Sequence, residues 1–136
     1  MLQGRNDTIK EENNMTEKEI FIEGMKTRTK KFAVDIIKFC ETLKTCKSSA
    51  VITYQIVKSA TSTGANYRAS CKARSKNEFF SKMSIVVEEV DETEYWLEVI
   101  NDASLSNDNI ELNRLLNEAK ELNKITSKAR NTASNK

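Results

Sequence analysis

Apolar residues recur at steps of three and four along four stretches of this chain, and polar segments separate these stretches. In the first, over about residues 27–45, the apolar positions are Phe32, Ile36, Phe39 and Leu43. This spacing places side chains on one face of an α-helix. We therefore predict a first helix over these residues.

The second stretch, about residues 50–73, predicts a helix that contains a glycine, Gly64. A glycine inside a helix costs about 1 kcal/mol relative to alanine, so a compensating reason is expected. We interpret Gly64 as a point of close approach by a neighbouring helix. A kink or break there is the alternative, although helical spacing resumes directly after it. The preceding link, residues 46–49, ends in hydroxyl residues suited to an N-cap.

Two further helices open with the spacing of a capping box, in which an N-cap side chain precedes a glutamate by three residues. Ser75 precedes Glu78, and Asp108 precedes Glu111. The last helix continues the three-four rhythm along its apolar side through Leu112, Leu115, Ala119, Leu122, Thr126 and Ala129. Lysine and arginine at its end, namely Lys124, Lys128 and Arg130, complement the negative pole of the helix dipole.

The third helix carries two apolar lines. The predicted buried seam consists of Phe80, Met83, Val87, Val90, Glu94 and Leu97. A second line beside it consists of Phe79, Val86, Trp96 and Ile100. Because a small bundle needs only one apolar line per helix, we predict that the second line forms a subunit interface.

These elements predict an all-α fold, an antiparallel up-down-up-down four-helix bundle over residues 26–130, because short links force consecutive helices to run antiparallel. The absence of proline and the presence of only 3 glycines agree with helices rather than hairpins. Residues 1–25 lack a sustained apolar period, so we predict a flexible N-terminal extension, with Ile20, Phe21, Ile22 and Met25 as a possible lead-in turn. Residues 131–136 are polar and are predicted to form a disordered tail.

The composition excludes several protein classes. No run of about 20 apolar residues exists, and the first residues are polar, so neither a membrane span nor a signal peptide is expected. Three cysteines at distant positions fit reduced thiols better than a disulfide framework. We predict a soluble, cytoplasmic protein.

The chain contains no histidine. This absence removes the commonest general base and metal ligand, and every Ser-His or Cys-His nucleophile arrangement. The cysteines form no C-x-x-C pair and are interpreted as buried small hydrophobes, and Gly64 lies in no phosphate-binding loop. The acids from Glu88 to Glu98 are interpreted as a solvated face on which only Glu94 points inward. We therefore expect no enzymatic activity, no metal and no cofactor.

The formal net charge is only +2, but the charges are segregated along the chain. Residues 88–121 contain eleven acids and two bases, whereas residues 58–82 contain a single acid, Glu78. The six bases of the latter segment form the predicted nucleic-acid-binding surface: Lys58, Arg68, Lys72, Arg74, Lys76 and Lys82. The alternative role of these bases is solubility, together with ion pairs to acids of the third helix.

Three segments resemble a known family. They are QIVKSATSTGANYR (55–68), ARSKNEF with the following Lys82 (73–82) and ETEYWL (92–97). They are similar to bacterial four-helix-bundle proteins named for intervening sequences in 23S ribosomal RNA genes, and the resemblance covers about residues 28–122. It implies a bundle that associates into a homopentamer. It also implies kinship with accessory proteins of diversity-generating retroelements, ring-shaped pentamers that bind nucleic acid and a reverse transcriptase.

One departure from the family pattern concerns this surface. The family usually has glutamate where this chain has Ala69, which leaves one more uncompensated base beside Arg68. Asn66 and Glu94 follow the pattern and are expected to be partly buried in hydrogen bonds.

The sequence thus predicts a non-catalytic, homo-oligomeric bundle that binds RNA or DNA through its basic surface, and the resemblance implies that the oligomer is a pentamer. The alternative is a protein-protein interaction scaffold with no nucleic-acid contact, whose second apolar line recruits a reverse transcriptase or another protein partner.

Overall fold

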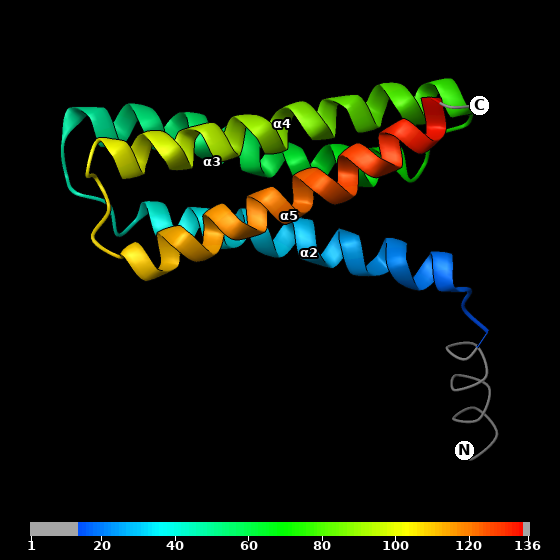
Figure 1. Cartoon of the computed structure of the whole chain (residues 1–136), viewed down its shortest axis with the longest axis horizontal. Coiled ribbons are helices and arrows are strands. Elements are labelled where there is room, and N and C mark those ends of the chain that lie inside the picture. Colours follow the sequence, from blue (N-terminus) through cyan, green and yellow to red (C-terminus); the bar gives the residue numbers. More distant parts are fainter. Residues whose placement is uncertain (1–13, 135–136) are drawn as a thin grey trace, which may run out of the picture.

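The computed structural model describes residues 14–134, which fold into four long helices (Figure 1). The helices are α2 (Glu17–Cys40), α3 (Lys47–Ser70), α4 (Lys76–Asp102) and α5 (Asn109–Ser134). Residues 14–134 contain no strand, and the predicted all-α four-helix bundle is confirmed. Predictions for residues 1–13 and 135–136 fall outside the described part of the chain.

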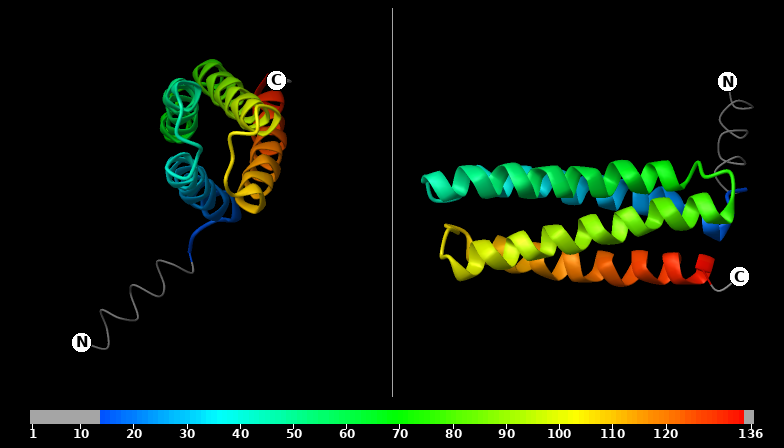
Figure 2. Two further views of the ribbon diagram at one scale, coloured as in Figure 1. Left: turned by 90° about the vertical axis from the view of Figure 1, so that its left-hand side faces the viewer. Right: turned by 90° about the horizontal axis from the view of Figure 1, so that it is seen from above.

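The helices follow one another around the bundle in chain order, each antiparallel to the next (Figure 2). Each consecutive pair packs closely, whereas α2 and α5 make the fewest contacts of any adjacent pair. Figure 1 shows the reason: α5 starts beside the end of α2 and rises toward the start of α4, so α2 and α5 diverge. The first turns of α2 therefore stand apart, with Ile20 and Phe21 exposed.

Helix α2 begins about ten residues earlier than the apolar period predicts. The side chain of Thr16 accepts a hydrogen bond from the backbone N–H of Glu19 at 3.1 Å, and Glu17 and Glu19 occupy the positive end of the helix dipole. Residues 17–25 thus continue α2 rather than form part of an extension, and Met25 is buried in the core. At the other end of the chain, α5 extends through residues 131–134, which were expected to be a tail.

The caps of the later helices agree with two of three expectations. The Ser75 hydroxyl accepts from the Glu78 N–H at 3.0 Å, and the Asp108 carboxylate accepts from the Glu111 N–H at 3.1 Å, as the capping-box spacing predicts. Helix α3 instead starts three residues early, at Lys47. Its N-cap is Cys46, which makes no side-chain capping bond, and the serines of the link lie inside the helix.

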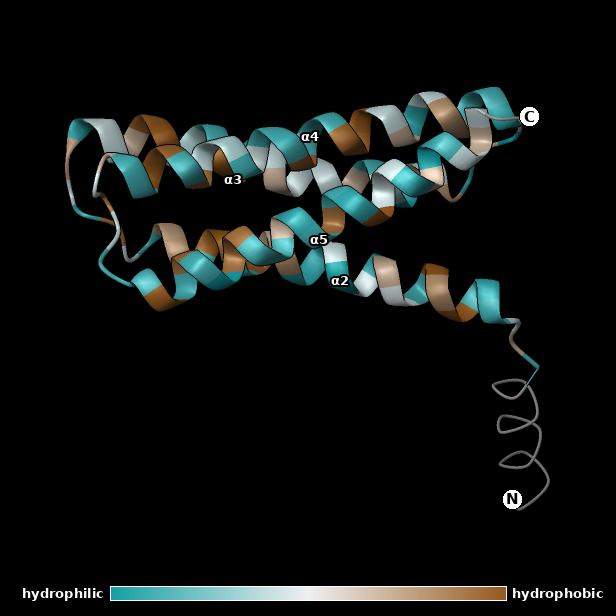
Figure 3. Ribbon diagram, viewed as in Figure 1, coloured by the Kyte–Doolittle hydropathy of each residue, from teal (hydrophilic) through white to brown (hydrophobic). Residues whose placement is uncertain are grey.

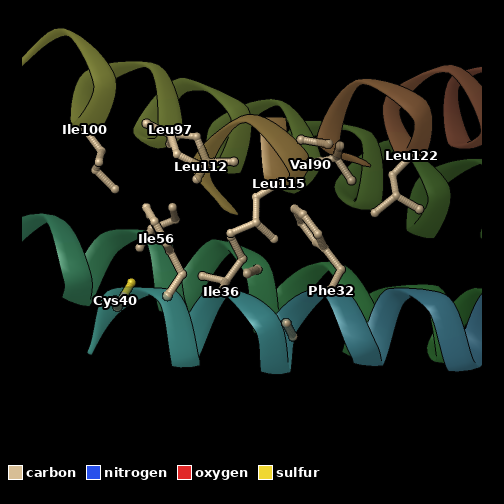
Figure 4. Packing of buried hydrophobic residues seen from close by; sticks show 14 of the residues in the cluster. Phe32, Ile36, Cys40, Ile56, Val90, Leu97, Ile100, Leu112, Leu115 and Leu122 are labelled. Carbon is tan, nitrogen blue, oxygen red and sulfur yellow. The ribbon is translucent and has the colours of Figure 1, made fainter. Parts of the chain in front are cut away.

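The core lies along the axis of the bundle, where apolar side chains from all four helices meet (Figure 4). Each large aliphatic or aromatic side chain buried there contributes about 1.5–3 kcal/mol to stability. The fully buried members of this core include Phe32, Ile36, Ile56, Val90, Leu97, Leu112, Leu115 and Leu122.

The buried face of α4 differs from the predicted seam. It consists of Met83, Val86, Val90, Thr93, Leu97 and Ile100. Val86 and Ile100 are completely buried within the monomer, so their assignment to a subunit interface is wrong. Phe79 and Trp96 pack against the core while partly exposed, and their place in an interface stays a prediction.

Gly64 lies against the backbone of α2. A Cβ atom added there would be 3.5 Å from the carbonyl oxygen of Thr29 and 3.7 Å from the backbone nitrogen of Lys30. Two helix backbones approach this closely only where no larger side chain separates them. The predicted close approach at Gly64 is confirmed.

Candidate nucleic-acid interface

A short turn between α3 and α4 gathers four of the six predicted bases. Backbone hydrogen bonds hold this turn, from the N–H of Lys72 to the carbonyl of Ala69 and from the N–H of Ala73 to the carbonyl of Ser70, both at 3.1 Å. We call these four residues the turn bases, because they lie in the last turn of α3, in the link and at the start of α4: Arg68, Lys72, Arg74 and Lys76. All four side chains are exposed.

The other two predicted bases lie farther away. Lys82 is half-buried, six residues into α4 from Lys76. Lys58 is exposed on α3, ten residues before Arg68, which corresponds to about 15 Å along the helix. The structure therefore places Lys58 outside the group at the turn.

Few intramolecular ion pairs occupy these bases. Arg74 Nε lies 3.4 Å from Glu78 Oε2, but the Arg74 side chain is 89% exposed, and such a pair contributes little. Among residues 14–134 no ion pair within 4 Å involves the other five predicted bases. Among the six predicted bases, only Arg74 therefore forms an ion pair with an acid of α4 in the described part of the chain.

A second group of bases, which the sequence analysis assigned only to dipole compensation, lies at the same end of the bundle. The last turns of α5 carry Lys124, Lys128 and Arg130. The antiparallel topology brings the end of α5 beside the start of α4, as Figures 1 and 2 show. We call the turn bases and these three residues together the basic end. Acids at this end are Glu78, Glu121, whose Oε1 lies 3.5 Å from Lys124 Nζ, and, at the start of α2, Glu17 and Glu19.

Helix α4 carries the opposite charge over most of its length. No lysine or arginine occurs between Lys82 and Arg114. Within the described residues, no acid between Glu88 and Asp102 forms an ion pair. Partial burial, together with the neighbouring carboxylate of Glu92, raises the pKa of Glu89.

Glu94 and Asn66 were expected to be partly buried in hydrogen bonds. The Asn66 side chain is half-buried and donates from Nδ2 to the Ser62 carbonyl at 2.9 Å, which confirms this expectation. Glu94 is also half-buried, but its carboxylate accepts no hydrogen bond from residues 14–134, and Thr93 occupies the buried position instead. Partial burial and the nearby Glu98 raise the pKa of Glu94.

A shallow groove of about 290 Å³ follows the outer surface where α2 meets α3. We call it the α2–α3 groove; its lining residues are Lys30, Ala33, Val34, Ile37, Thr61, Gly64, Ala65 and Arg68. The close approach at Gly64 forms part of its floor, and Val34 and Ile37 leave 39% and 40% of their surface exposed. No acid lines this groove, and its two charged residues are both basic.

A second hollow of about 390 Å³ lies at the α2–α3 link and contains two of the three cysteines. Burial raises the pKa of Cys40 to about 11. Cys46 is exposed rather than buried, which corrects its interpretation as a core residue, and a hydrogen bond with the Ser49 hydroxyl at 3.2 Å lowers its pKa. The only carboxylate in this hollow is that of Glu41. Residues 14–134 contain no cluster of three potential metal-ligating side chains.

Comparison with known proteins identifies relatives. The model of the family described as "23S rRNA-intervening sequence protein" matches residues 25–128. A crystal structure from Bacteroides thetaiotaomicron, described as a protein with unknown function from the S23 ribosomal protein family, is similar with a TM-score of 0.68 and 32% sequence identity. The similarity covers 77% of the present chain and 96% of that chain. No curated protein sequence matches, and no helix within residues 14–134 has the length and hydropathy of a membrane span.

Proposed function

The chain belongs to the family of 23S rRNA-intervening sequence proteins, and from this membership we propose that it is a non-catalytic homo-oligomer that binds RNA or DNA through its basic end. Five copies is the number that the resemblance to the ring-shaped accessory proteins implies. In such an assembly the basic ends of several copies form one shared surface. The family name connects these proteins with ribosomal RNA genes, which agrees with a nucleic-acid ligand.

One observation carries this proposal: bases from the α3–α4 turn and from the end of α5, far apart in sequence, lie at one end of the bundle. No acid occurs from Thr42 to Asn77. Exposed bases without carboxylate partners attract phosphates, and each base that contacts a phosphate releases a condensed counterion. The absence of histidine supports the non-catalytic part of the proposal.

Binding can be measured by fluorescence anisotropy with short labelled RNA and DNA strands, both single-stranded and duplex. We expect affinity at low salt to fall steeply between about 50 mM and about 200 mM salt. The triple variant Lys72→Ala, Arg74→Ala, Lys76→Ala should bind more weakly, with a salt slope lower by about two to three. A second triple variant, Lys124→Ala, Lys128→Ala, Arg130→Ala, reports the contribution of α5.

The matched control is Lys38→Ala, Lys44→Ala, Lys47→Ala, which removes the same charge from exposed positions toward the opposite end. It should retain the wild-type salt slope. Absence of nucleic-acid affinity at low salt, or an equal loss in all three variants, would contradict the proposal. The interaction scaffold would then be the better account, and a pull-down that returns one stoichiometric protein would support it.

A further inference from the structure

We propose that copies of this chain associate head to tail, with the α2–α3 groove of one copy receiving the acidic outer face of α4 from the next. This inference deepens the proposed function, because it rests on self-association and names the two surfaces that meet.

The outer face of α4 is a continuous acidic stripe. Its exposed residues recur about once per helical turn, with two adjacent acids at the second position: Glu88, Asp91, Glu92, Tyr95, Glu98 and Asp102. Tyr95 is 54% exposed, at the centre of the stripe, and its ring lies edge-on to that of Trp96 at 5.0 Å between centroids. The stripe therefore offers one aromatic side chain with carboxylates a turn before and a turn after it.

The carboxylates of this stripe lack cationic partners. They form no ion pair within the described residues, and no base on α4 follows Lys82. Like charges one turn apart on a helix destabilise it. A partner that brings positive charge to this stripe would relieve the repulsion.

The α2–α3 groove has the complementary character. Lys30 and Arg68 are exposed and form no ion pair within residues 14–134, and α3 contains no acid along its whole length. Beside these bases the groove offers exposed apolar surface from Val34 and Ile37. Figure 3 shows hydrophobic segments alternating with hydrophilic ones along α2. An aromatic ring flanked by carboxylates matches such a groove in both polarity and charge.

The groove and the stripe lie on different parts of the bundle surface, although α3 forms one wall of the groove and also packs against α4. No Cα atom of α2 lies within 8 Å of one in α4, and Figure 2 shows the two helices on opposite sides of the bundle. The groove of one copy therefore cannot bind the acidic stripe of the same copy. A contact between two different surfaces is heterologous, and repeating it produces either a closed ring or a filament.

Charge reversal tests this pairing in the full chain. The groove variant is Lys30→Glu, Arg68→Glu, and the stripe variant is Glu88→Lys, Glu92→Lys; all four positions are exposed on helices. Light scattering coupled to size exclusion should show an assembly for wild type and monomers for each variant alone. An equimolar mixture should assemble again with the two variants alternating, because the reversed groove of one matches the reversed stripe of the other and the unreversed groove and stripe also match. A chain with all four reversals should assemble again, since both surfaces have exchanged charge.

A neutral variant provides a second measurement. Ala65→Gln fills the groove without changing any charge, and it should also weaken assembly, while circular dichroism checks that the helices are intact. Two monomeric variants that fail to pair when mixed, or variants that assemble as wild type does, would overturn the head-to-tail pairing alone. A monomeric wild type would overturn both the pairing and the proposed oligomer. Nucleic-acid affinity is scored separately with the Lys72, Arg74 and Lys76 variant, which should assemble normally.

Discussion

The hydroxyl oxygens of Ser59 on α3 and Thr93 on α4 lie 2.8 Å apart, and both side chains are completely buried. Each hydroxyl also lies within hydrogen-bond distance of a carbonyl in its own helix, Ser59 with Ile56 at 3.1 Å and Thr93 with Glu89 at 2.8 Å. One hydroxyl thus donates to the other across the interface between α3 and α4, and the accepting hydroxyl can donate its own proton to the carbonyl of its own helix. The pair joins α3 to α4 at a position where the core is otherwise apolar.

A double-mutant cycle measures this pair. We expect Thr93→Val to lower the free energy of unfolding by about 1 kcal/mol, because it removes the hydrogen bond between the two hydroxyls. The Ser59 hydroxyl then bonds only the Ile56 carbonyl of its own helix. The double variant Ser59→Ala, Thr93→Val should lose less than the sum of the single losses, since no buried polar group is left without its partner. Urea unfolding gives the three values, and strict additivity would contradict a direct interaction.

Gly64 and Gly24 provide a matched test of close helix packing. Gly64→Ala should stabilise the protein by up to about 1 kcal/mol, because the new Cβ atom makes an ordinary contact 3.5 Å from the Thr29 carbonyl oxygen. Gly64→Leu should instead destabilise it by about 1–3 kcal/mol, since larger side chains press α2 and α3 apart. At Gly24, where nothing lies within 4 Å, both substitutions should be tolerated. Equal effects of leucine at the two sites in thermal unfolding would contradict this account.

Stability should depend on pH through carboxylates with opposite pKa shifts. Burial alone would raise the pKa of Asp35, but hydrogen bonds from Lys31 at 2.6 Å and Arg114 at 2.9 Å outweigh it, and the pKa is lowered. The hydrogen bond from Arg114 also lowers the pKa of Glu111. These two carboxylates stabilise the fold above their unfolded pKa values of about 4, and this contribution is lost as pH falls through the lower folded values.

The raised pKa of Glu94 has the opposite effect on stability: protonation removes a partly buried charge and its repulsion from Glu98, so stability increases as pH falls through the folded pKa. Asp35→Asn should therefore flatten the loss of stability below about pH 4, whereas Glu94→Gln should remove the gain of stability that acidification gives above about pH 4. Urea unfolding over this pH series checks both variants. Curves of unfolding free energy against pH that run parallel for the two variants and wild type would contradict the pKa shifts assigned to Asp35 and Glu94.

The cysteines should differ in reactivity toward a disulfide reagent at neutral pH. Cys46 is exposed, and the hydrogen bond with Ser49 lowers its pKa, so it should react first. Cys40 is buried with a pKa of about 11 and should react about tenfold or more slowly in the folded protein. Cys46→Ser should abolish the fast phase and Cys40→Ser should preserve it. A fast phase that survives Cys46→Ser would show that another thiol is the accessible one.

The number of helices, their approximate extents and most of the core could be predicted from local patterns. The capping boxes at Ser75 and Asp108 fix two helix starts, and a similar signal, Thr16 followed by Glu19, precedes α2 but lies where the apolar period is weak. Gly64 could be connected with close packing because glycine is costly inside a helix without such a reason. These features depend on residues within one or two turns of each other.

The buried register of α4 required the tertiary structure. Met83, Val90 and Leu97 fit two alternations equally well, one that continues through Val87 and Glu94 and one that continues through Val86 and Thr93. The folded bundle adopts the second, which sets the Thr93 hydroxyl against Ser59 and leaves Glu94 partly exposed. Neighbouring stripes on a helix lie only a fraction of a turn apart, so the choice between them depends on the partner helix.

By itself the sequence determined which residues form helices, how the links force an antiparallel order, and that bases and acids occupy separate segments. Only the tertiary structure decided that the bases of α5 join those of the α3–α4 turn, that Lys58 lies apart from them, and that Lys30 meets Arg68 in one groove. Helix formation and capping are governed by residues three or four apart, which a single stretch of sequence contains. A binding surface is made by residues from different helices, and their proximity follows from how those helices pack.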